Sequence, residues 1–324
     1  MGNLKIGVIM DPVEKIDIGK DTTFVLMLEA ERRGHELYYM ELDDLSIRGV
    51  TPQGRCRRLS VRRATPHYRL GESAARPLDS FQIVLMRKDP PVDMKYFVAT
   101  QLLSLVDERK TVVMNHPRGL REANEKLYAL HFPDLIPETL VSGELAELKT
   151  FLGDLGGEMI IKPLDGCGGS GVFYLNRKDK NTNALLEAAT GNGKKPIMAQ
   201  RYLPEVRQGD KRVIVLDGEP IGAVLRVPRE DENRGNIHAG GRVVKTGLTA
   251  RDREICRAMS PALKELGLYF VGLDVIGDYL TEVNVTSPTG VQEINVLDGV
   301  QLETRVVDFI EKRAAELPES APLS

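Results

Sequence analysis

Two adjacent apolar runs late in the chain, Tyr269 to Ile276 and Leu280 to Val285, carry polar residues in their interiors. Their β-branched and aromatic residues predict two strands, and their short separation predicts a hairpin. Asp274 lies in the first run, and Glu282 and Asn284 lie in the second. Because an ionised group among apolar side chains is unfavourable unless it is paired or bound to a cation, these residues indicate a site. The alternative is an exposed hairpin face with incidental polar residues, which fits the apolar flanks poorly.

The register of this hairpin decides whether the polar residues meet. Glu282 and Asn284 are two residues apart, so a strand projects both from one face. A three-residue loop over 277–279 would place Asp274 opposite Glu282, whereas a two-residue loop would pair Asp274 with Thr281 and break up the group. Oxygen ligands of this kind suit Mg²⁺ that holds nucleotide phosphates better than they suit zinc.

A glycine-rich segment, 166–171, has the spacing G-x-G-x-x-G of the dinucleotide fingerprint. That fingerprint requires a following helix, but Val172 to Leu175 favours a strand, and no Lys-Ser or Lys-Thr pair completes a Walker A loop. The segment is therefore predicted to be the loop of a β-hairpin whose amides can approach phosphates. An ordinary hairpin tip is the alternative. Lys162, which ends the preceding strand, adds a positive charge beside these amides.

The rest of the chain alternates short apolar runs with helical stretches, which predicts an α/β (α+β) protein. A small parallel α/β domain is expected in the first third, and the basic segment Arg48 to Arg76 is predicted to be a solvated hairpin or loop without a nucleic-acid role. Strands are predicted over 4–10, 35–40, 82–86, 111–114, 158–162, 172–175, 196–200, 212–216 and 221–226. Helices are predicted from Asp21 to Gly34, over 94–108, 184–189 and 250–266, and from near Val300.

Composition excludes several classes of protein. The 324 residues have a formal net charge of only −3 with interspersed signs, so neither nucleic acid nor an anionic membrane is expected as a partner. No run reaches the ~18 apolar residues of a membrane helix, and the N-terminus does not read as a signal peptide. Three widely spaced cysteines outside any C-x-x-C pattern disfavour disulfides and zinc, so a cytoplasmic location is expected.

Several stretches together resemble the bacterial glutathione synthetases of the ATP-grasp superfamily. The most specific are Lys162-Pro163-Leu164-Asp165-Gly166, Gly209-Asp210-x-Arg212 and Glu282-x-Asn284-x-Thr286-Ser287-Pro288-Thr289. Further similar stretches are 10–12, 86–91, 115–117, 124–126 and 239–242, in the expected order. The resemblance covers almost the entire chain except Arg48 to Arg76 and the tail after Leu317.

The resemblance implies an ATP-grasp fold with an N-terminal parallel α/β (pre-ATP-grasp) domain. The expected divisions are a substrate-binding domain at 1–124, a small subdomain with the glycine loop at 125–200, a catalytic subdomain with the metal hairpin at 201–317 and a disordered tail at 318–324. A homotetramer is also implied.

The resemblance further implies roles for individual residues. ATP would be bound by Lys126, Lys162, Gly166, Gly168, Gly169, Ser170, Gly171, Gln200, Arg201, Tyr202, Leu203 and Asp210. Two Mg²⁺ ions, with Mn²⁺ as a possible substitute, would be bound by Asp274, Glu282 and Asn284. Lys162, Arg212 and Arg226 would be catalytic, and substrate would contact Asp11, Arg87, Lys88, Arg212, Arg226, Ser287, Gly240, Gly241 and Arg242. The segment Pro228 to Gly241 resembles the family's mobile lid.

The implied reaction joins γ-glutamylcysteine to glycine through an acyl phosphate, with ATP converted to ADP and phosphate. Two alternatives stay open from the sequence: another ATP-grasp carboxylate–amine ligase, such as a D-alanine–D-alanine ligase, and a non-catalytic ATP-binding protein of the synapsin type.

Overall fold

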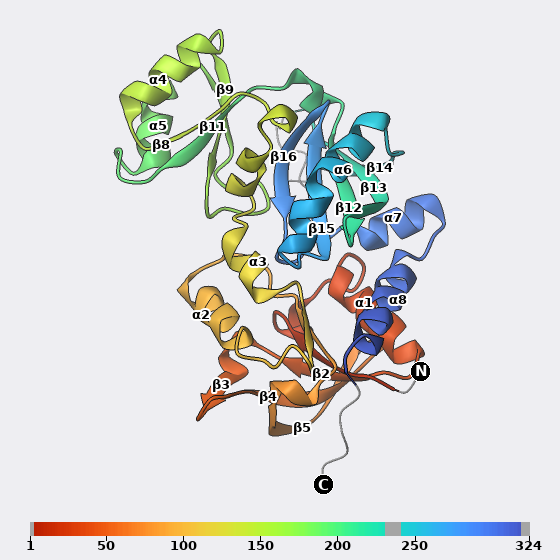
Figure 1. Ribbon diagram of the computed structural model, residues 1–324. Coiled ribbons are helices and arrows are strands. Elements are labelled where there is room, and N and C mark those ends of the chain that lie inside the picture. Colours follow the sequence, from red (N-terminus) through yellow and green to blue (C-terminus); the bar gives the residue numbers. More distant parts are fainter. Residues whose placement is uncertain (1–2, 231–240, 319–324) are drawn as a thin grey trace.

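The computed structural model describes residues 3–230 and 241–318, which form three sheets flanked by helices (Figure 1). In this view the first sheet lies at the bottom and the other two lie above it. None of the helices in the described ranges is long and apolar enough to cross a membrane.

The first sheet has the strand order β3-β4-β2-β1-β6-β7, and β5 pairs with β4 off this path. Its parallel part consists of β1 (Lys5–Ile9), β2 (Glu36–Met40), β6 (Ile83–Met86) and β7 (Val112–Met114), which confirms the four predicted strands. Its antiparallel part consists of β3 (Leu45–Arg48), β4 (Thr51–Val61) and β5 (Tyr68–Pro77). The parallel core expected for this domain is therefore present, and the hairpin of the basic segment extends it into a mixed sheet.

The basic segment forms the predicted hairpin, β4 with β5, but only part of it is solvated. β4 alternates buried and accessible residues, and Cys56, Leu59 and Val61 point into the core. The prediction weighed the arginines of this segment and not the apolar residues between them. A register shift between Arg57 and Leu59 lets Cys56 and Leu59 both face the core.

Helices cover the first sheet. They are α1 (Thr22–Arg32), α2 (Met94–Leu103) and the short α3 (Pro117–Glu122). The carboxylates of Asp21 and Asp93 cap α1 and α2 by accepting from the amides of Phe24 and Tyr96. The helix predicted over 94–108 thus ends five residues early, and a turn with Asp107 and Arg109 follows it.

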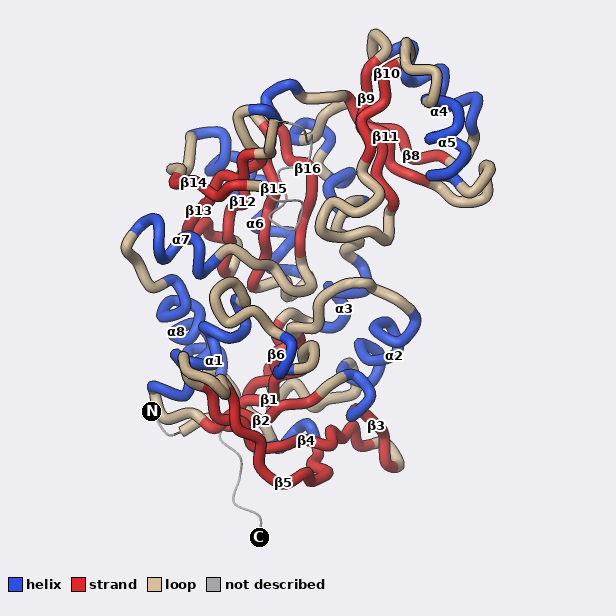
Figure 2. The backbone as a smooth tube through the Cα atoms, turned by 180° about the vertical axis from the view of Figure 1, so that it is seen from behind, coloured by secondary structure: helices blue, strands red, loops and turns tan. Residues whose placement is uncertain are grey.

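The second sheet is antiparallel with the order β10-β9-β11-β8. Its strands are β8 (Thr139–Ser142), β9 (Glu158–Pro163), β10 (Phe173–Asn176) and β11 (Ile197–Arg201). The helix α4 (Leu145–Asp154) connects β8 to β9, and α5 (Thr182–Thr190) connects β10 to β11. Leu148, Met159, Ile161 and Leu186 belong to a hydrophobic core separate from that of the rest of the molecule. Figure 2 shows this sheet, at the upper right, set apart from the other two.

The third sheet, also antiparallel, has the order β14-β13-β12-β15-β16. Its elements are β12 (Asp210–Leu216), β13 (Glu219–Val227), β14 (Arg242–Lys245), β15 (Phe270–Ile276) and β16 (Tyr279–Asn284). The helices α6 (Ala250–Glu265) and α7 (Val291–Asp298) flank it, and α8 (Leu302–Ala315) continues from α7 to pack against α1 (Figure 1). Successive residues of β12 point to opposite faces of the sheet and pack in different cores. Val213 packs in the cluster that contains α6, and Ile214 packs in the cluster that contains α7 and α8.

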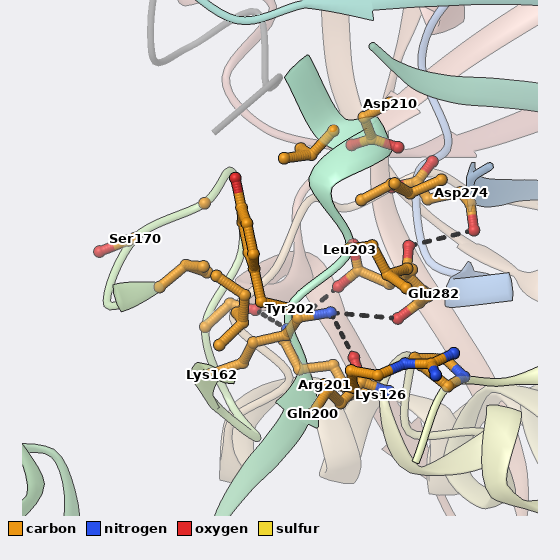
Figure 3. Close-up of a pocket in the computed structure, with 18 of the residues that line it drawn as sticks. Lys126, Lys162, Ser170, Gln200, Arg201, Tyr202, Leu203, Asp210, Asp274 and Glu282 are labelled. Atoms are coloured by element: carbon orange, nitrogen blue, oxygen red, sulfur yellow. Dashed lines mark hydrogen bonds and ion pairs between the residues drawn. The ribbon is translucent and has the colours of Figure 1, made fainter. Parts of the chain in front are cut away.

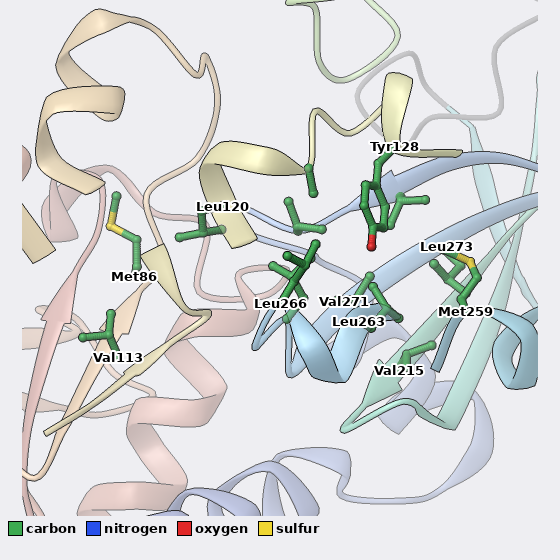
Figure 4. Packing of buried hydrophobic residues seen from close by; sticks show 14 of the residues in the cluster. Met86, Val113, Leu120, Tyr128, Val215, Met259, Leu263, Leu266, Val271 and Leu273 are labelled. Carbon is green, nitrogen blue, oxygen red and sulfur yellow. The ribbon is translucent and has the colours of Figure 1, made fainter. Parts of the chain in front are cut away.

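One continuous core joins the first and third sheets (Figure 4). It runs from Met86 on β6 through Leu120 of α3 to Leu266 and Val271. Asn115 adds polar links at this junction, because its side-chain amide donates to the carbonyls of Phe270 and Val285, at 2.8 and 2.7 Å. The N-terminal sheet is thereby fixed against the base of the β15–β16 hairpin.

Candidate active site

A cleft lies between the second and third sheets, with an empty volume of about 810 Å³ counted out to the solvent at its mouth. Residues of both sheets line it, together with the segment that connects them (Figure 3). Among the predicted ATP-binding residues, the lining contains Lys126, Lys162, Gly166, Gly169, Ser170, Gln200, Arg201, Tyr202, Leu203 and Asp210. Two of the three predicted metal ligands, Asp274 and Glu282, line it as well.

The glycine segment is the β9–β10 hairpin loop, as predicted, with Ile161 paired to Phe173. Gly168, Gly169 and Gly171 have φ of 61°, 80° and 72°, in the left-handed region that side chains disfavour. At Gly171 an added Cβ would also lie 2.9 Å from a ring carbon of Pro163. Glycine is thus required at these positions by the backbone, and the loop closes one side of the cleft.

Two lysines face this loop across the cleft. The Nζ of Lys126 donates to the carbonyl of Gly166 at 2.5 Å and pairs with Oε1 of Glu282 at 3.1 Å. The Nζ of Lys162 donates to Oε1 of Gln200 at 2.8 Å, and Gln200 in turn donates to Thr139. Burial lowers the pKa of Lys162, although the charge of Glu282 opposes this shift.

Asp274 and Glu282 are directly paired across the hairpin, but the loop between the strands differs from the expected one. Ile276 pairs with Tyr279, so the loop has two residues, and the register shifts between Asp274 and Val275. Thr281 is the extra residue of this β-bulge. The prediction that Asp274 faces Glu282 is confirmed, whereas the loop length given as its reason was wrong.

Asp274 lies at the centre of a buried charge network. Arg212 contacts it through two hydrogen bonds, Nε to Oδ1 at 2.5 Å and NH2 to Oδ2 at 3.0 Å, and Arg226 contacts Oδ2 at 2.9 Å. Burial alone would raise the pKa of Asp274, but the two guanidinium groups outweigh it and hold that pKa below its usual range.

Asp210 completes the network. Its Oδ2 accepts from Arg226 at 2.5 Å, and its Oδ1 is buried without a hydrogen-bond partner among the described residues. Burial raises the pKa of Asp210, and the charge of Asp274 adds to this against the attraction of Arg226. The network therefore combines two arginines with two aspartates beneath one end of the cleft.

The donor set fits Mg²⁺ bound together with nucleotide phosphates. Within the described ranges, no group of three or more His, Cys, Asp or Glu residues is arranged to hold a metal by itself. Mg²⁺ commonly takes one or two carboxylates and completes its shell with phosphate oxygens and water. Glu282 is half-buried at the cleft, and the oxygen of Asn284 is available because its Nδ2 donates to the Gly272 carbonyl at 3.2 Å.

The segment 200–203 lines the cleft beside several apolar residues. Leu203, Ile160 and Val206 supply apolar lining, and Tyr202 packs edge-on against Tyr174 with ring centroids 4.8 Å apart. Apolar walls beside charged residues are typical of nucleotide sites, since they separate base from phosphates.

The predicted substrate residues form a second group outside the cleft lining. Lys88 pairs with Asp11 at 2.9 Å, and the buried Arg87 donates to Thr23 at 3.0 Å and to the carbonyl of Pro288 at 3.0 Å. Ser287 is half-buried beside Pro288 in the chain.

Arg212 links the two groups, because it donates to the carbonyl of Thr289 at 3.3 Å as well as to Asp274. Gly241 and Arg242 lie at the start of β14. Gly240, with most of the segment predicted to be a lid, falls in 231–240, outside the described residues.

Sequence reasoning assigned no role to Glu125, which the structure places at the base of the metal hairpin. Its Oε1 accepts from the amides of Val285 and Thr286, at 2.9 and 3.1 Å, and from the Thr286 hydroxyl at 2.8 Å. Burial raises its pKa, and the charge of Glu282 adds to the shift. The feature of the sequence that could have pointed to Glu125 was its position next to Lys126, in a stretch that resembles the family.

Comparison with known families identifies both parts of the chain. Residues 4–121 match the family described as prokaryotic glutathione synthetase, N-terminal domain. Residues 125–299 match the family described as prokaryotic glutathione synthetase, ATP-grasp domain.

Individual proteins agree with this result. The chain is 53% identical over 313 residues to a glutathione synthetase of Gloeobacter violaceus, with coverage of 95% of this chain and 96% of the relative. It is 46% identical over 311 residues to one of Brucella melitensis, with coverage of 96% and 99%.

Solved structures with a similar fold include a synthetase and an ATP-grasp ligase. The D-cycloserine synthetase DcsG superimposes with a TM-score of 0.64 at 15% identity, with coverage of 94% of this chain and 99% of that one. The ATP-grasp ligase PsnB, in a complex with minimal precursor, Mg and ADP, gives 0.62 at 18% identity, with coverage of 96% and 98%. At these identities the likeness shows the fold, which confirms the predicted fold class.

Proposed function

We infer that this chain, which belongs to the prokaryotic glutathione synthetase family, joins γ-glutamylcysteine to glycine in an ATP-dependent reaction that passes through an acyl phosphate. The chain is thus an ATP-dependent ligase, and the questions that remain concern which residues perform each step.

The residue assignments rest on one observation: charged side chains from separate elements meet at one cleft. Lys126 and Lys162 come from separate elements, yet both reach Glu282 or its neighbour Thr281. The cleft is thus bordered by the glycine loop, two ammonium groups and a carboxylate hairpin. A triphosphate needs both cations and backbone amides, and we assign its phosphates to this region.

In the first step, a carboxylate oxygen of γ-glutamylcysteine attacks the γ-phosphorus of ATP, forming the acyl phosphate and releasing ADP. Lys126 and Lys162 hold the phosphate oxygens, and Arg226 and Arg212 place positive charge where negative charge accumulates. Charge stabilisation of this kind by an arginine is worth ~10³-fold or more in rate.

We assign two Mg²⁺ ions, replaceable by Mn²⁺, to Asp274, Glu282 and Asn284 together with the phosphates of ATP. When bound, these ions neutralise phosphate oxygens and help to align the γ-phosphoryl group. Because both oxygens of Asp274 already accept from arginines, Glu282 is the more accessible of the two carboxylates.

In the second step, the glycine amine attacks the acyl carbon, the carbon–nitrogen bond forms, and phosphate departs as the amine loses a proton. We place the peptide near the second group of residues, Asp11, Arg87, Lys88 and Ser287. Arg212 touches the Thr289 carbonyl at the edge of this group, so it is suited to orient the reacting carboxylate beside Asp274. We further propose a homotetramer located in the cytoplasm.

The direct test is phosphate release from Mg-ATP by the purified protein, with γ-glutamylcysteine, glycine or the metal omitted in turn. Release that requires all components, with glutathione as the product, supports the proposal. Release with other amino acids in place of glycine, or tight ATP binding without turnover, would support the alternative ligase or the non-catalytic protein.

A further inference from the structure

The outer edge of β16 is held by a single residue, Glu125. β16 is the last strand of the third sheet, so the amides on its free side have no neighbouring strand to bond among the described residues. Such edge groups need other acceptors. The main-chain carbonyl of Glu125 accepts from the amide of Val283 at 2.8 Å, and its Oε1 accepts from the amide of Val285 at 2.9 Å.

These contacts lie on both sides of Asn284, since Val283 precedes it and Val285 follows it. The amide and the hydroxyl of Thr286 also donate to Oε1 of Glu125, at 3.1 and 2.8 Å. The side chain of Asn284 is fixed separately, because its Nδ2 donates to a carbonyl of β15 at 3.2 Å. One residue therefore holds the main chain on both sides of an assigned metal ligand, and the direction of the Asn284 oxygen depends on it.

The chain neighbours of this glutamate hold the opposite wall of the cleft. The Nζ of Lys126 donates to the carbonyl of Gly166 and pairs with Glu282 (Figure 3). The side-chain amide of Asn124 donates to the carbonyl of Leu164 at 3.0 Å. Three consecutive residues thus tie the glycine loop to the metal hairpin, across the cleft to which the phosphates are assigned.

A carboxylate suits the position of Glu125 because an ionised carboxylate accepts several hydrogen bonds and donates none. Its Oε1 accepts three, and bonds to an ionised acceptor are roughly twice as strong as bonds between neutral groups. Val285 and Thr286 are both buried, so an alanine in place of Glu125 would leave their amides without this acceptor. The hairpin would then lose its fixed edge next to the metal ligands.

We propose that Glu125 is a positioning residue for the metal site. By holding 283–286, it fixes the oxygen of Asn284 relative to the carboxylate of Glu282 before metal and nucleotide bind. This inference rests on the proposed function, which assigns Mg²⁺ to these two ligands. Groups that orient metal ligands in this way contribute about 10–100-fold in metal affinity or activity.

The first experiment measures binding of a non-hydrolysable ATP analogue to the full-length chain by calorimetry, at a series of Mg²⁺ concentrations. In Glu125→Ala we expect the Mg²⁺ concentration at half-maximal binding to rise ~10-fold or more. Glu125→Gln keeps an acceptor oxygen, so its value should lie between those of Glu125→Ala and the unaltered chain. A residue that only supported the fold would lower Tm without moving this concentration.

Glu122→Ala is the matched control, because Glu122 lies three residues earlier, is exposed and pairs with Arg118 within α3. We expect it to keep the Mg²⁺ dependence of the unaltered chain. Thr286→Val removes only the hydroxyl among the three donors to Oε1. It should shift the Mg²⁺ concentration in the same direction as Glu125→Ala but by less, and it tests the proposal even if Glu125→Ala fails to fold.

A second experiment needs neither metal nor nucleotide. Hydrogen–deuterium exchange of the ligand-free chain follows the individual amides on the free edge of β16. In Glu125→Ala the amides of Val285 and Thr286 should exchange ~10-fold faster or more, since each loses a hydrogen bond to a charged group. The amide of Val283 bonds to the main-chain carbonyl, which alanine retains, so its exchange should change less.

Three results would each overturn the proposal: an unchanged Mg²⁺ dependence in folded Glu125→Ala, no shift in Thr286→Val, or unchanged exchange of the Val285 and Thr286 amides. Analogue binding by the unaltered chain that does not depend on Mg²⁺ would overturn it together with the metal assignment. Mg²⁺-dependent binding without glutathione formation would refute the proposed function only, and the shift in Glu125→Ala would still support the positioning role.

Discussion

Asp274 and Glu282 face each other across β15 and β16 because Thr281 bulges out of the ladder between them. A two-residue turn would otherwise have paired Asp274 with Thr281. The bulge turns the Thr281 carbonyl toward Lys162, whose Nζ lies 3.5 Å away, while the Thr281 hydroxyl donates to the Asp274 carbonyl at 3.1 Å. One extra residue thus sets the position of both the carboxylates and the lysine.

Replacing the more accessible carboxylate should abolish turnover but leave the fold intact. Glu282→Gln removes a negative ligand and the ion pair with Lys126, so we expect kcat to fall by ~10²-fold or more, with little change in Tm. Steady-state kinetics at several Mg²⁺ concentrations measures this. Glu187→Gln, on the exposed side of α5, is the control. Near-normal kcat in Glu282→Gln would remove Glu282 from the metal site.

Asp274 should matter for stability as well as for activity. Asp274→Asn leaves the buried Arg212 and Arg226 without their shared counter-charge, and removal of one partner of a buried ion pair lowers the free energy of unfolding by ~3–5 kcal/mol. Denaturant unfolding without ligands measures it. Asp17→Asn disrupts an exposed pair with Lys20 and should change that free energy by less than ~1 kcal/mol. Equal effects of the two variants would contradict the buried network.

A glycine of β15 should control the position of Arg212. A Cβ added at Gly272 would lie 2.9 Å from Cδ of Arg212 and 3.1 Å from Cβ of Pro288. Gly272→Ala should therefore push the guanidinium away from Asp274, and we expect kcat/KM to fall ~10-fold or more.

The matched control for this change is Gly153→Ala. Gly153 lies in α4, where an added Cβ would meet no atom of the described residues within 4 Å outside its own helix turn, so alanine there should leave kcat/KM unchanged and stabilise the helix by ~0.5–1 kcal/mol. Normal activity of Gly272→Ala would show that Arg212 has room to adjust.

Acid should weaken the ion pairs at the C-terminal end of α1. The hydrogen bond from Arg32 outweighs burial and, with that from Arg33, lowers the pKa of Glu29 to about 2. Because the folded pKa lies below the unfolded value of 4.5, this stabilisation is complete above that value and is lost as the pH falls toward 2. Glu29→Gln should thus be less stable than the unaltered chain at pH 7, with a difference that shrinks below pH ~4.5.

Urea unfolding across this pH range, with Glu187→Gln as the control, tests the sign. A difference between Glu29→Gln and the unaltered chain that stays constant down to pH 3 would show that the carboxylate charge is not responsible. Arg33 also pairs with Asp308 of α8 at 2.6 Å, a contact that Glu29→Gln leaves in place.

The sequence alone determined most local structure and much of the site. Asp21 specified where α1 begins, and the apolar runs specified the strands, because capping and burial periodicity act within a few residues. Acidic residues inside apolar strands and glycines before a strand also pointed to the cleft without any knowledge of tertiary contacts. The resemblance to a family supplied the roles that such patterns leave open.

Only the tertiary structure decided how distant segments meet. The bulge at Thr281 depends on contacts of both strands, so loop length alone misjudged the turn. Glu125 lies 160 residues from Val285 in the chain, and its role at the base of the hairpin exists only after folding. The exposure of Met94 and Phe97 on α2 could not be predicted either, because an apolar side chain does not reveal from sequence whether another part of the chain will cover it.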